Sequence, residues 1–235
     1  MPAVLITGAN RGLGLEFCRQ YAASGWDVLA ASRSSSEELE ELGKLPKVTL
    51  YSVDVGDSAS VQQLADALGD QPIDVLINNA GYFGCVGFAE GGVEHQAFGD
   101  TDFDNWANVM NINVFGPMRV TEALVDNVAA SEQKKVVTLS SMLGSMELNT
   151  IGGLYAYRSS KAAVNMMMKS MAVDLQKRGV LAVAVHPGWA KTEMGGPGAE
   201  VEPGEGVAGL RRVIERLTEQ QLGQLIAFDG NILPY

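Results

Sequence analysis

The segment Ala3-Val4-Leu5-Ile6-Thr7-Gly8-Ala9-Asn10-Arg11-Gly12-Leu13-Gly14 decides the fold. Its apolar start predicts a buried strand, and its glycines predict a turn that leads into a helix. A strand that ends in glycines before a helix is how a parallel α/β sheet builds a phosphate-binding site. Gly8 would allow the tight turn, Gly12 the approach of a pyrophosphate, and Gly14 the close packing of helix on strand. We therefore expect a dinucleotide to bind here.

Strand-like and helix-like segments alternate along the rest of the chain. Near-continuous apolar strands separated by helices predict a parallel sheet covered on both faces, and right-handed crossovers make it doubly wound. We predict one α/β domain over residues 1–235, with a doubly wound seven-stranded parallel sheet in the order 3-2-1-4-5-6-7 and helices on both faces. Strands are expected at 4–7, 27–31, 48–53, 73–77, 134–139, 180–185 and 224–228, and helices at 13–24, 35–42, 58–68, 102–128, 155–177 and 205–217.

The composition fits a single acidic domain. The chain has 235 residues, 46% of them hydrophobic, which is enough for one sizeable core. Its formal net charge of -11 argues against nucleic acid and against an anionic membrane surface as partners. The same charge repels a dinucleotide at long range, so cations close to the turn must hold it.

Metal, disulfide and membrane chemistry have little support in the sequence. The two cysteines, Cys18 and Cys85, are too few for a disulfide framework, and the two histidines, His95 and His186, lie far apart, so we expect no metal site. No basic segment or cleavage site precedes the first strand, and no apolar run approaches about 18 residues. We therefore expect a soluble cytoplasmic protein.

The end of the second strand indicates which dinucleotide binds. A site for NAD places an acidic residue there, whereas this chain has Ser32 followed by Arg33. Arg33 and Arg11, the latter preceded by Asn10, could bracket a 2'-phosphate, because guanidinium groups match its oxygens. This arrangement favours NADP(H); the alternative is that either arginine is a solvated surface residue.

Two further strand ends could contact the cofactor. Asp54-Val55 closes the third strand, where a carboxylate and a backbone group could reach an adenine ring; the alternative is an ordinary turn aspartate. Asn78-Asn79-Ala80-Gly81 follows the fourth strand. Its small residues leave room for a ribose, and its asparagines can fix the turn by hydrogen bonds to the backbone.

The strongest catalytic signal is the pair Tyr157 and Lys161. Because they are four residues apart in a helical stretch, they share one face. A phenol with a pKa of about 10 is a poor acid–base group at neutral pH. We expect the ammonium of Lys161, helped by the positive charge of an oxidised nicotinamide, to lower the pKa of Tyr157. Tyr155 points elsewhere on the helix and would pack or line the substrate entrance. The methionines of this helix would pack the core or a subunit interface: Met166, Met167, Met168 and Met171.

Hydroxyl and amide side chains complete the candidate site. The fifth strand ends in Leu139-Ser140-Ser141, and a hydroxyl at this edge could orient a carbonyl and stabilise its developing charge. Ser141 is our first choice and Ser140 the alternative. Asn113 lies within a helix, where an amide is a poor helix former and invites an explanation.

Together these residues resemble the short-chain dehydrogenase/reductase family, a Rossmann-type fold, over nearly the whole chain. The pair Asn10-Arg11 is similar to NADPH-dependent carbonyl reductases, and the stretches 142–145, 155–158, 192–196 and 228–235 resemble the C-factor/sniffer-type branch. The spacing from the serines to Tyr157 is longer than in many members of the family, because of the segment 149–153.

The resemblance implies roles for individual residues. Tyr157 would be the general acid in reduction, with Lys161 as its partner and a ribose ligand. Ser141 would position the carbonyl, and Asn113 would support a water in a proton relay. The cofactor site would be completed by Leu13 in the glycine turn, by Pro187-Gly188 beside the nicotinamide, and by Thr192 on its carboxamide or the phosphates. The whole predicted cofactor site comprises Gly8, Asn10, Arg11, Gly12, Leu13, Gly14, Ser32, Arg33, Asp54, Val55, Asn79, Ala80, Gly81, Tyr157, Lys161, Pro187, Gly188 and Thr192.

We therefore expect an NADPH-dependent reductase for a small or medium aldehyde or ketone. Loops 82–102 and 188–204 would line the pocket, and the second could close as a lid. By the family resemblance, the long helices 102–128 and 155–177 would join the subunits of a homodimer or homotetramer. The alternatives are a weakly catalytic, NADP(H)-binding signalling protein of the C-factor type and an alcohol dehydrogenase working in the oxidative direction. The substrate itself cannot be read from a motif, because its pocket lies in loops.

Overall fold

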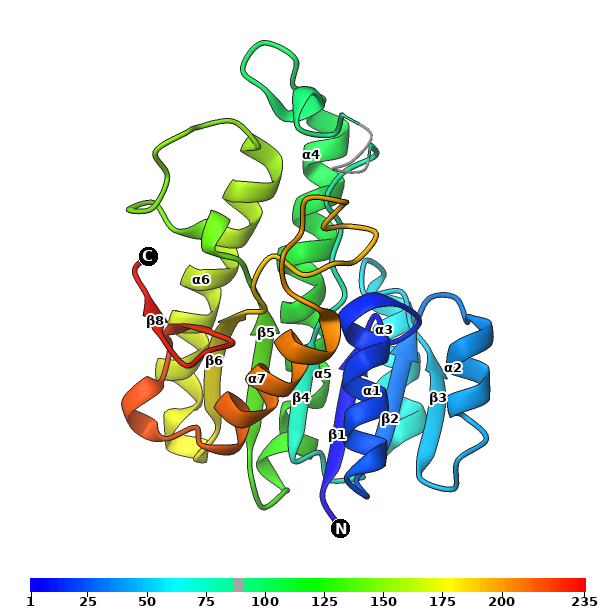
Figure 1. The fold of residues 1–235 in the computed structure, drawn as a ribbon. Coiled ribbons are helices and arrows are strands. Elements are labelled where there is room, and N and C mark those ends of the chain that lie inside the picture. Colours follow the sequence, from blue (N-terminus) through cyan, green and yellow to red (C-terminus); the bar gives the residue numbers. More distant parts are fainter. Residues whose placement is uncertain (87–90) are drawn as a thin grey trace.

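The computed structural model describes residues 1–86 and 91–235. Within them, the strands form one eight-stranded sheet in the order β3-β2-β1-β4-β5-β6-β7-β8 (Figure 1). The pairings from β3 through β7 are parallel, and β8 pairs with β7 in the antiparallel direction. The strands are β1 (Ala3–Thr7), β2 (Asp27–Ser32), β3 (Val48–Ser52), β4 (Val75–Asn78), β5 (Lys135–Leu139), β6 (Leu181–His186), β7 (Leu225–Ala227) and β8 (Ile232–Leu233).

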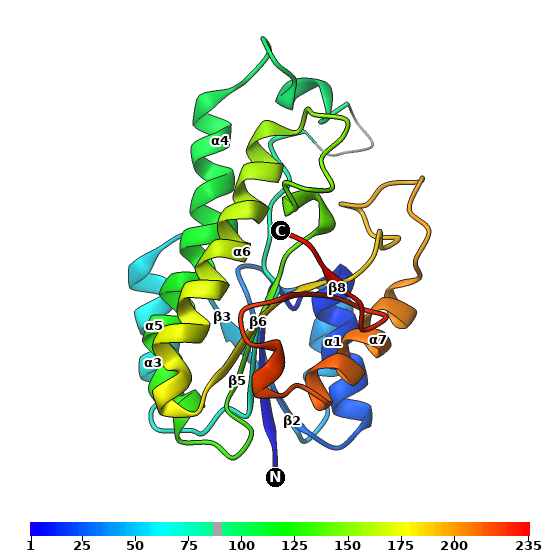
Figure 2. The same ribbon diagram turned by 90° about the vertical axis from the view of Figure 1, so that its left-hand side faces the viewer.

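Helices cover both faces of the sheet, as Figure 2 shows from the side. Successive side chains of a strand point to opposite faces. Val4 and Ile6 of β1 therefore join a core with α1, α2 and α7, whereas Leu5 joins a second core with α3, α5 and α6. The helices are α1 (Gly12–Ala23), α2 (Glu37–Leu42), α3 (Ser58–Leu68), α4 (Phe103–Met110), α5 (Gly116–Ala129), α6 (Tyr155–Leu175) and α7 (Pro203–Glu215).

The predicted strand order and doubly wound topology are confirmed, with one addition. The chain turns back after β7, where the backbone N–H of Ala227 donates to the carbonyl of Asn231 at 2.8 Å, and β8 adds an antiparallel edge strand. The sheet is therefore not wholly parallel. A two-residue strand is too short to show a periodic pattern, which explains why the sequence did not reveal it.

The single helix predicted at 102–128 is interrupted. Asp102 caps α4, and a π-helical turn over Asn111–Phe115 separates α4 from α5. Pro117 lies in the first turn of α5. In a regular helix its ring would crowd the carbonyl of Asn113 and it has no N–H to donate there. A wider π turn relieves this conflict and gives Asn113 a distinct orientation.

The carboxyl ends of the parallel strands lie at the upper edge of the sheet in Figure 1. The glycine turn after β1 and the segments that follow β4, β5 and β6 meet at this edge. Ligands of doubly wound sheets bind outside the carboxyl ends of the strands. The candidate site is therefore built from these connections.

Candidate active site

The turn between β1 and α1 has the backbone that its glycines were expected to allow. Gly8 and Gly12 have φ angles of +68° and +55°, in the region that favours glycine. A Cβ on Gly14 would lie 2.1 Å from the carbonyl oxygen of Gly8, so helix and strand are too close for a side chain. Leu13 packs against the core, and α1 begins at Gly12 without a side-chain cap. The first N–H groups of α1 therefore suit an anion such as a dinucleotide phosphate.

Asn79 ties this turn to the end of β4. Its Nδ2 donates to the carbonyls of Thr7 at 2.8 Å and Gly8 at 3.1 Å. In return, the hydroxyl oxygen of Thr7 accepts from the backbone N–H groups of Asn79 and Ala80, both at 3.1 Å. Beside them, a Cβ on Gly81 would meet nothing closer than 3.7 Å. The sequence predicted the asparagine and the small residues, but not the part of Thr7.

Arg11 faces the loop that follows β6. Its guanidinium is paired with the carboxylate of Glu193, and both side chains are largely exposed. The neighbouring Thr192 lies against the glycine turn, with its Cγ2 3.5 Å from the position of a Cβ on Gly12. The structure thus brings Thr192 and Arg11 to the same edge. Nothing in the sequence indicated that Glu193 would pair with Arg11.

The loop after β6 leaves the sheet through Pro187 and Gly188. Gly188 has a φ of +79°, and a Cβ there would lie 2.8 Å from a methyl carbon of Val201. A β-bridge joins Ala190 to Val201 within the loop. Contacts within the loop after β6 therefore stabilise it where it approaches the glycine turn.

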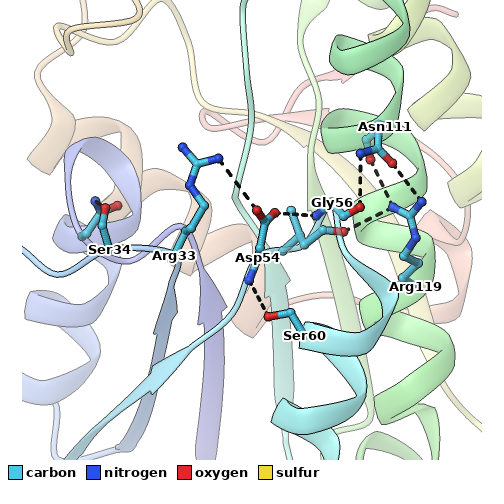
Figure 3. Close-up of polar contacts among 9 residues, drawn as sticks. Arg33, Ser34, Asp54, Gly56, Ser60, Asn111 and Arg119 are labelled. Atoms are coloured by element: carbon cyan, nitrogen blue, oxygen red, sulfur yellow. Dashed lines mark hydrogen bonds and ion pairs between the residues drawn. The ribbon is translucent and has the colours of Figure 1, made fainter.

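Arg33 lies beside Asp54 at the ends of β2 and β3 (Figure 3). The nearest atoms of the pair, Nη1 and Oδ2, are 3.9 Å apart. Oδ1 of Asp54 accepts from the backbone N–H of Gly56 at 2.8 Å, and the backbone N–H of Asp54 donates to the hydroxyl of Ser60 at 2.9 Å. One carboxylate oxygen thus shapes the turn, as the alternative interpretation held, and the other faces an exposed arginine.

Ser32 and Asn10 stabilise the turn that presents Arg33. Ser32 is buried, and its hydroxyl donates to the carbonyl of Ser34 at 3.0 Å. Asn10 donates from Nδ2 to the hydroxyl of Ser34 at 3.4 Å. Both predicted residues therefore lie at the site, but their polar atoms are engaged with the protein. Arg33 keeps a largely exposed charged group at this position.

Arg119 supports the other side of the turn at Asp54, and this role was not predicted from the sequence. It donates to the side-chain oxygen of Asn111 at 2.8 Å and to the carbonyl of Val55 at 3.3 Å. Asn111 donates to the carbonyl of Gly56 at 3.2 Å. Figure 3 shows how these contacts connect α5 to the turn. The backbone of Val55 is thereby fixed where an adenine contact was predicted.

Tyr157 and Lys161 lie together on α6, as their spacing predicted. The Nζ atom of Lys161 is 5.5 Å from the centre of the Tyr157 ring. Lys161 is buried, and its Nζ donates to the carbonyl of Leu139 at the end of β5, at 2.8 Å. The ammonium is therefore anchored to the sheet edge on which the serines follow.

Burial raises the pKa of Tyr157 to about 12 in this structure, through desolvation of the phenol. Desolvation also lowers the pKa of Lys161 to about 8. Tyr157 therefore holds its proton at neutral pH. The predicted lowering of its pKa by Lys161 together with an oxidised nicotinamide stays a prediction.

The two candidate serines have different surroundings. The hydroxyl of Ser140 donates to Oδ1 of Asn165 at 2.6 Å. The hydroxyl oxygen of Ser141 accepts from the backbone N–H of Leu143 at 3.1 Å. The proton of Ser140 is committed to a buried amide, whereas Ser141 only accepts in the contact that it makes. This difference favours Ser141 as the donor to a carbonyl.

Asn113 joins the π-helical turn to two other segments. Its Oδ1 accepts from the backbone N–H of Tyr82 at 2.7 Å. Its Nδ2 donates to the carbonyl of Tyr82 at 2.9 Å and to the hydroxyl of Ser160 at 3.0 Å. Both amide protons are therefore used to hold the loop after β4 against α6.

Tyr155 lines a separate hollow of about 340 Å³, together with other aromatic side chains of the loop before α4 and of α4 itself. Its neighbours there are Phe98, Gly99, Thr101, Phe103 and Trp106. Of the methionines of α6, Met168 and Met171 are buried in the core, and Met166 is exposed. The alternative role in a subunit interface stays a prediction.

Residues 1–86 and 91–235 contain no cluster of histidine, cysteine or carboxylate side chains that could hold a metal ion. In the same residues, no helix is both long and apolar enough to cross a membrane. Cys18 is buried, and burial raises the pKa of its thiol to about 12, so it behaves as a small core residue.

The comparison with known families agrees with this geometry. Residues 2–202 match the family model described as short chain dehydrogenase. The chain belongs to the short-chain dehydrogenase family. Among its relatives, C-signal of Myxococcus xanthus is 40% identical over 164 residues, which are 70% of this chain and 93% of that protein. A 1-hydroxy-2-glutathionyl-2-methyl-3-butene dehydrogenase of Rhodococcus sp. strain AD45 is 32% identical over 242 residues, covering both chains completely.

Solved structures of short-chain dehydrogenases share the whole fold. The carbonyl reductase Sniffer of Drosophila melanogaster superimposes with a TM-score of 0.89 at 28% identity, over all of both chains. The NADPH-bound carbonyl reductase from chicken fatty liver has a TM-score of 0.88 at 28% identity, over 100% of this chain and 99% of that one. The expected branch of the family, with C-factor-like and sniffer-like members, is confirmed.

Proposed function

We propose that this short-chain dehydrogenase is an NADPH-dependent carbonyl reductase, in which Tyr157 donates the proton to the substrate oxygen. The observation that carries the proposal is the convergence of Tyr157, Lys161 and Ser141 at one edge of the sheet. Tyr157 holds its proton at neutral pH, as a general acid must, and the ammonium of Lys161 beside its ring would ease the release of that proton. The relatives that bind NADPH or reduce carbonyls supply the reaction class.

The chain's own residues fit an NADP(H) molecule. The uncapped start of α1 would take the pyrophosphate. The exposed guanidinium groups of Arg11 and Arg33 would take the 2'-phosphate, and Asp54 with Val55 the adenine. When bound, this cofactor supplies the hydride for the carbonyl carbon. Lys161 would hold the ribose and Thr192 the carboxamide or phosphates, as the family resemblance implies.

In the proposed reduction, the hydroxyl of Ser141 donates to the carbonyl oxygen and holds it near Tyr157. The phenol of Tyr157 gives its proton to this oxygen as negative charge develops there. The ammonium of Lys161 stabilises the phenolate that remains. Asn113 would hold the loop after β4 against α6, since both of its amide protons are donated to Tyr82 and Ser160. The water relay that the family resemblance implies for Asn113 stays a proposal, since its Oδ1 has a second lone pair that can accept from a water.

The substrate would enter between the two loops that follow β4 and β6. We propose that 82–86, 91–102 and 188–204 line the pocket of a domain that spans residues 1–235; the rest of the predicted loop 82–102 lies outside the described residues. Apolar walls such as Phe83, whose ring centre is 5.1 Å from that of Tyr157, suit a small or medium aldehyde or ketone. The same site would oxidise an alcohol when the phenolate is populated.

Replacing Tyr157 by phenylalanine tests the mechanism. We expect Tyr157→Phe to lower kcat for NADPH-dependent reduction on the order of 100-fold or more, because the general acid is removed. NADPH binding, followed by fluorescence, should persist. Tyr155→Phe is the matched control, since this neighbour faces the separate hollow. Turnover that survives Tyr157→Phe would overturn the proposed mechanism.

The similarity to C-signal favours a second candidate, an NADP(H)-binding signalling protein with little turnover. The same assay separates the two candidates. Wild-type protein that binds NADPH tightly but oxidises none of it with a panel of aldehydes, ketones and quinones would favour the signalling role.

A further inference from the structure

The helix that carries Tyr157 receives its N-terminal cap from a distant segment. α6 begins after Leu154, which has left-handed backbone angles and no side-chain cap. Instead, Oε1 of Gln96 accepts from the backbone N–H of Tyr157 at 2.8 Å, across 61 positions of sequence. Gln96 is only 2% exposed although it lies in the loop between β4 and α4. One of the unpaired donors of the first turn of α6 is thereby satisfied at the residue proposed as the acid.

The other end of the same carboxamide holds the wall beside Tyr157. Nε2 of Gln96 donates to the carbonyl of Phe83 at 2.8 Å. The ring of Phe83 in turn packs on the ring of Tyr157, with centres 5.1 Å apart. Gln96 therefore fixes both the backbone of Tyr157 and the residue against which its ring rests.

We propose that Gln96 is a positioning residue, whose carboxamide sets the place of the Tyr157 phenol and couples it to the order of the loop that lines the substrate pocket. The catalytic part of this inference rests on the proposed function of Tyr157. The contacts themselves do not depend on it.

The chemistry of the two partners fits a carboxamide at this position. A backbone N–H needs an acceptor and a backbone carbonyl needs a donor, and an amide serves both with one planar group. Glutamate keeps the acceptor and the size but loses the donor, and methionine keeps the size and loses both. Gly84 closes the space behind Gln96, because a Cβ there would lie 3.1 Å from Nε2 of Gln96.

The contact is tested first without any turnover, by hydrogen–deuterium exchange followed by mass spectrometry. In Gln96→Met we expect faster exchange in peptides that span 82–86 and 155–158, and no change in the strands. Gly84→Ala should raise exchange in the same two peptides, because its Cβ would crowd Nε2 of Gln96. Gln221→Met is the matched control, since Oε1 of Gln221 accepts a backbone N–H from Thr218 at 2.9 Å in a turn before β7. Unchanged exchange in both peptides for Gln96→Met would overturn the proposed positioning role of Gln96.

The consequence for Tyr157 is tested by kinetics of the same variants with NADPH. Because small misplacements of a reacting group are costly, we expect kcat to fall on the order of 10- to 100-fold in Gln96→Met, with the NADPH dissociation constant unchanged. Gln96→Glu should recover part of kcat and shift its pH profile, through the new charge near the phenol. A merely structural role would lower the melting temperature and leave kcat per folded molecule intact, which would refute positioning. Activity in Tyr157→Phe would instead refute the proposed function, whatever Gln96 does.

Discussion

At the scale of single residues, the cations proposed for the cofactor each have a carboxylate beside them. Arg11 is paired with Glu193, and Arg33 lies 3.9 Å from Asp54. Both arginines and Glu193 are largely exposed and Asp54 is partly exposed, so each pair is worth at most about 1 kcal/mol and is easily exchanged. A phosphate with two negative charges can therefore compete for both guanidinium groups. In a chain of net charge -11, such local contacts must outweigh the long-range repulsion.

Arg33→Asp should separate NADPH from NADH. We expect NADPH binding to weaken at least about tenfold, because a charge-assisted contact is replaced by repulsion. NADH binding should change little, since it lacks the 2'-phosphate. The dissociation constants can be measured by cofactor fluorescence, with Arg19→Asp on α1 as a charge-matched control. Equal losses for both cofactors would contradict the assignment of Arg33.

The lowered pKa of Lys161 predicts an alkaline limit for reduction. The ammonium predominates below pH 8, is half lost at its pKa of about 8 and is absent well above it. If it stabilises the phenolate, kcat for reduction should be constant below this value and fall above it. Lys161→Arg should be less active but lack the alkaline limb, because a guanidinium stays protonated. A wild-type profile that is flat up to pH 9.5 would argue against a charged Lys161 in the reaction.

At the scale of elements, strands β1 to β7 and most helices were readable from the sequence, whereas β8, the interruption between α4 and α5 and the contacts between loops were not. The glycine turn and the Tyr157–Lys161 spacing are local patterns, so the sequence predicted where they lie. The π-helical turn over Asn111–Phe115 also had a local cause in Pro117, yet a proline alone does not tell a kink from a helix end. Gln96 and Glu193 act through partners far away in the chain. No periodicity or spacing marks such pairs.

The ion pair of Glu193 with Arg11 joins the loop after β6 to the glycine turn, and Glu193 thereby occupies a cation proposed for the cofactor. Glu193→Gln should tighten NADPH binding by about two- to fivefold, because it removes a carboxylate that competes for Arg11. Glu202→Gln is the control, as Glu202 pairs with Lys191 in the same loop at 2.6 Å. Titrations at low and moderate salt would show the gain shrinking with ionic strength. Weaker NADPH binding in Glu193→Gln would mean that the pair helps to build the site.

At the scale of the whole molecule, the helices over one side of the sheet carry several exposed large hydrophobic side chains. They are Phe103 on α4, Phe115 in the π-helical turn, Met118 on α5, and Met166 and Val173 on α6. Exposed apolar side chains that gather on one surface mark association sites. These are the helices to which the family resemblance assigns the contact between subunits.

The homodimer proposed for these helices can be tested by its mass in solution. We expect light scattering to give at least twice the 25.0 kDa of one chain. Met166→Glu should shift the protein toward a monomer, because Met166 is 66% exposed on α6 and its charge would be buried in the contact. Met146→Glu, at a methionine 76% exposed in the loop before α6, should leave the mass unchanged. If the wild type is a monomer at every concentration, the apolar side serves something other than a second copy. If Met166→Glu keeps the mass of an oligomer, the contact lies on another face.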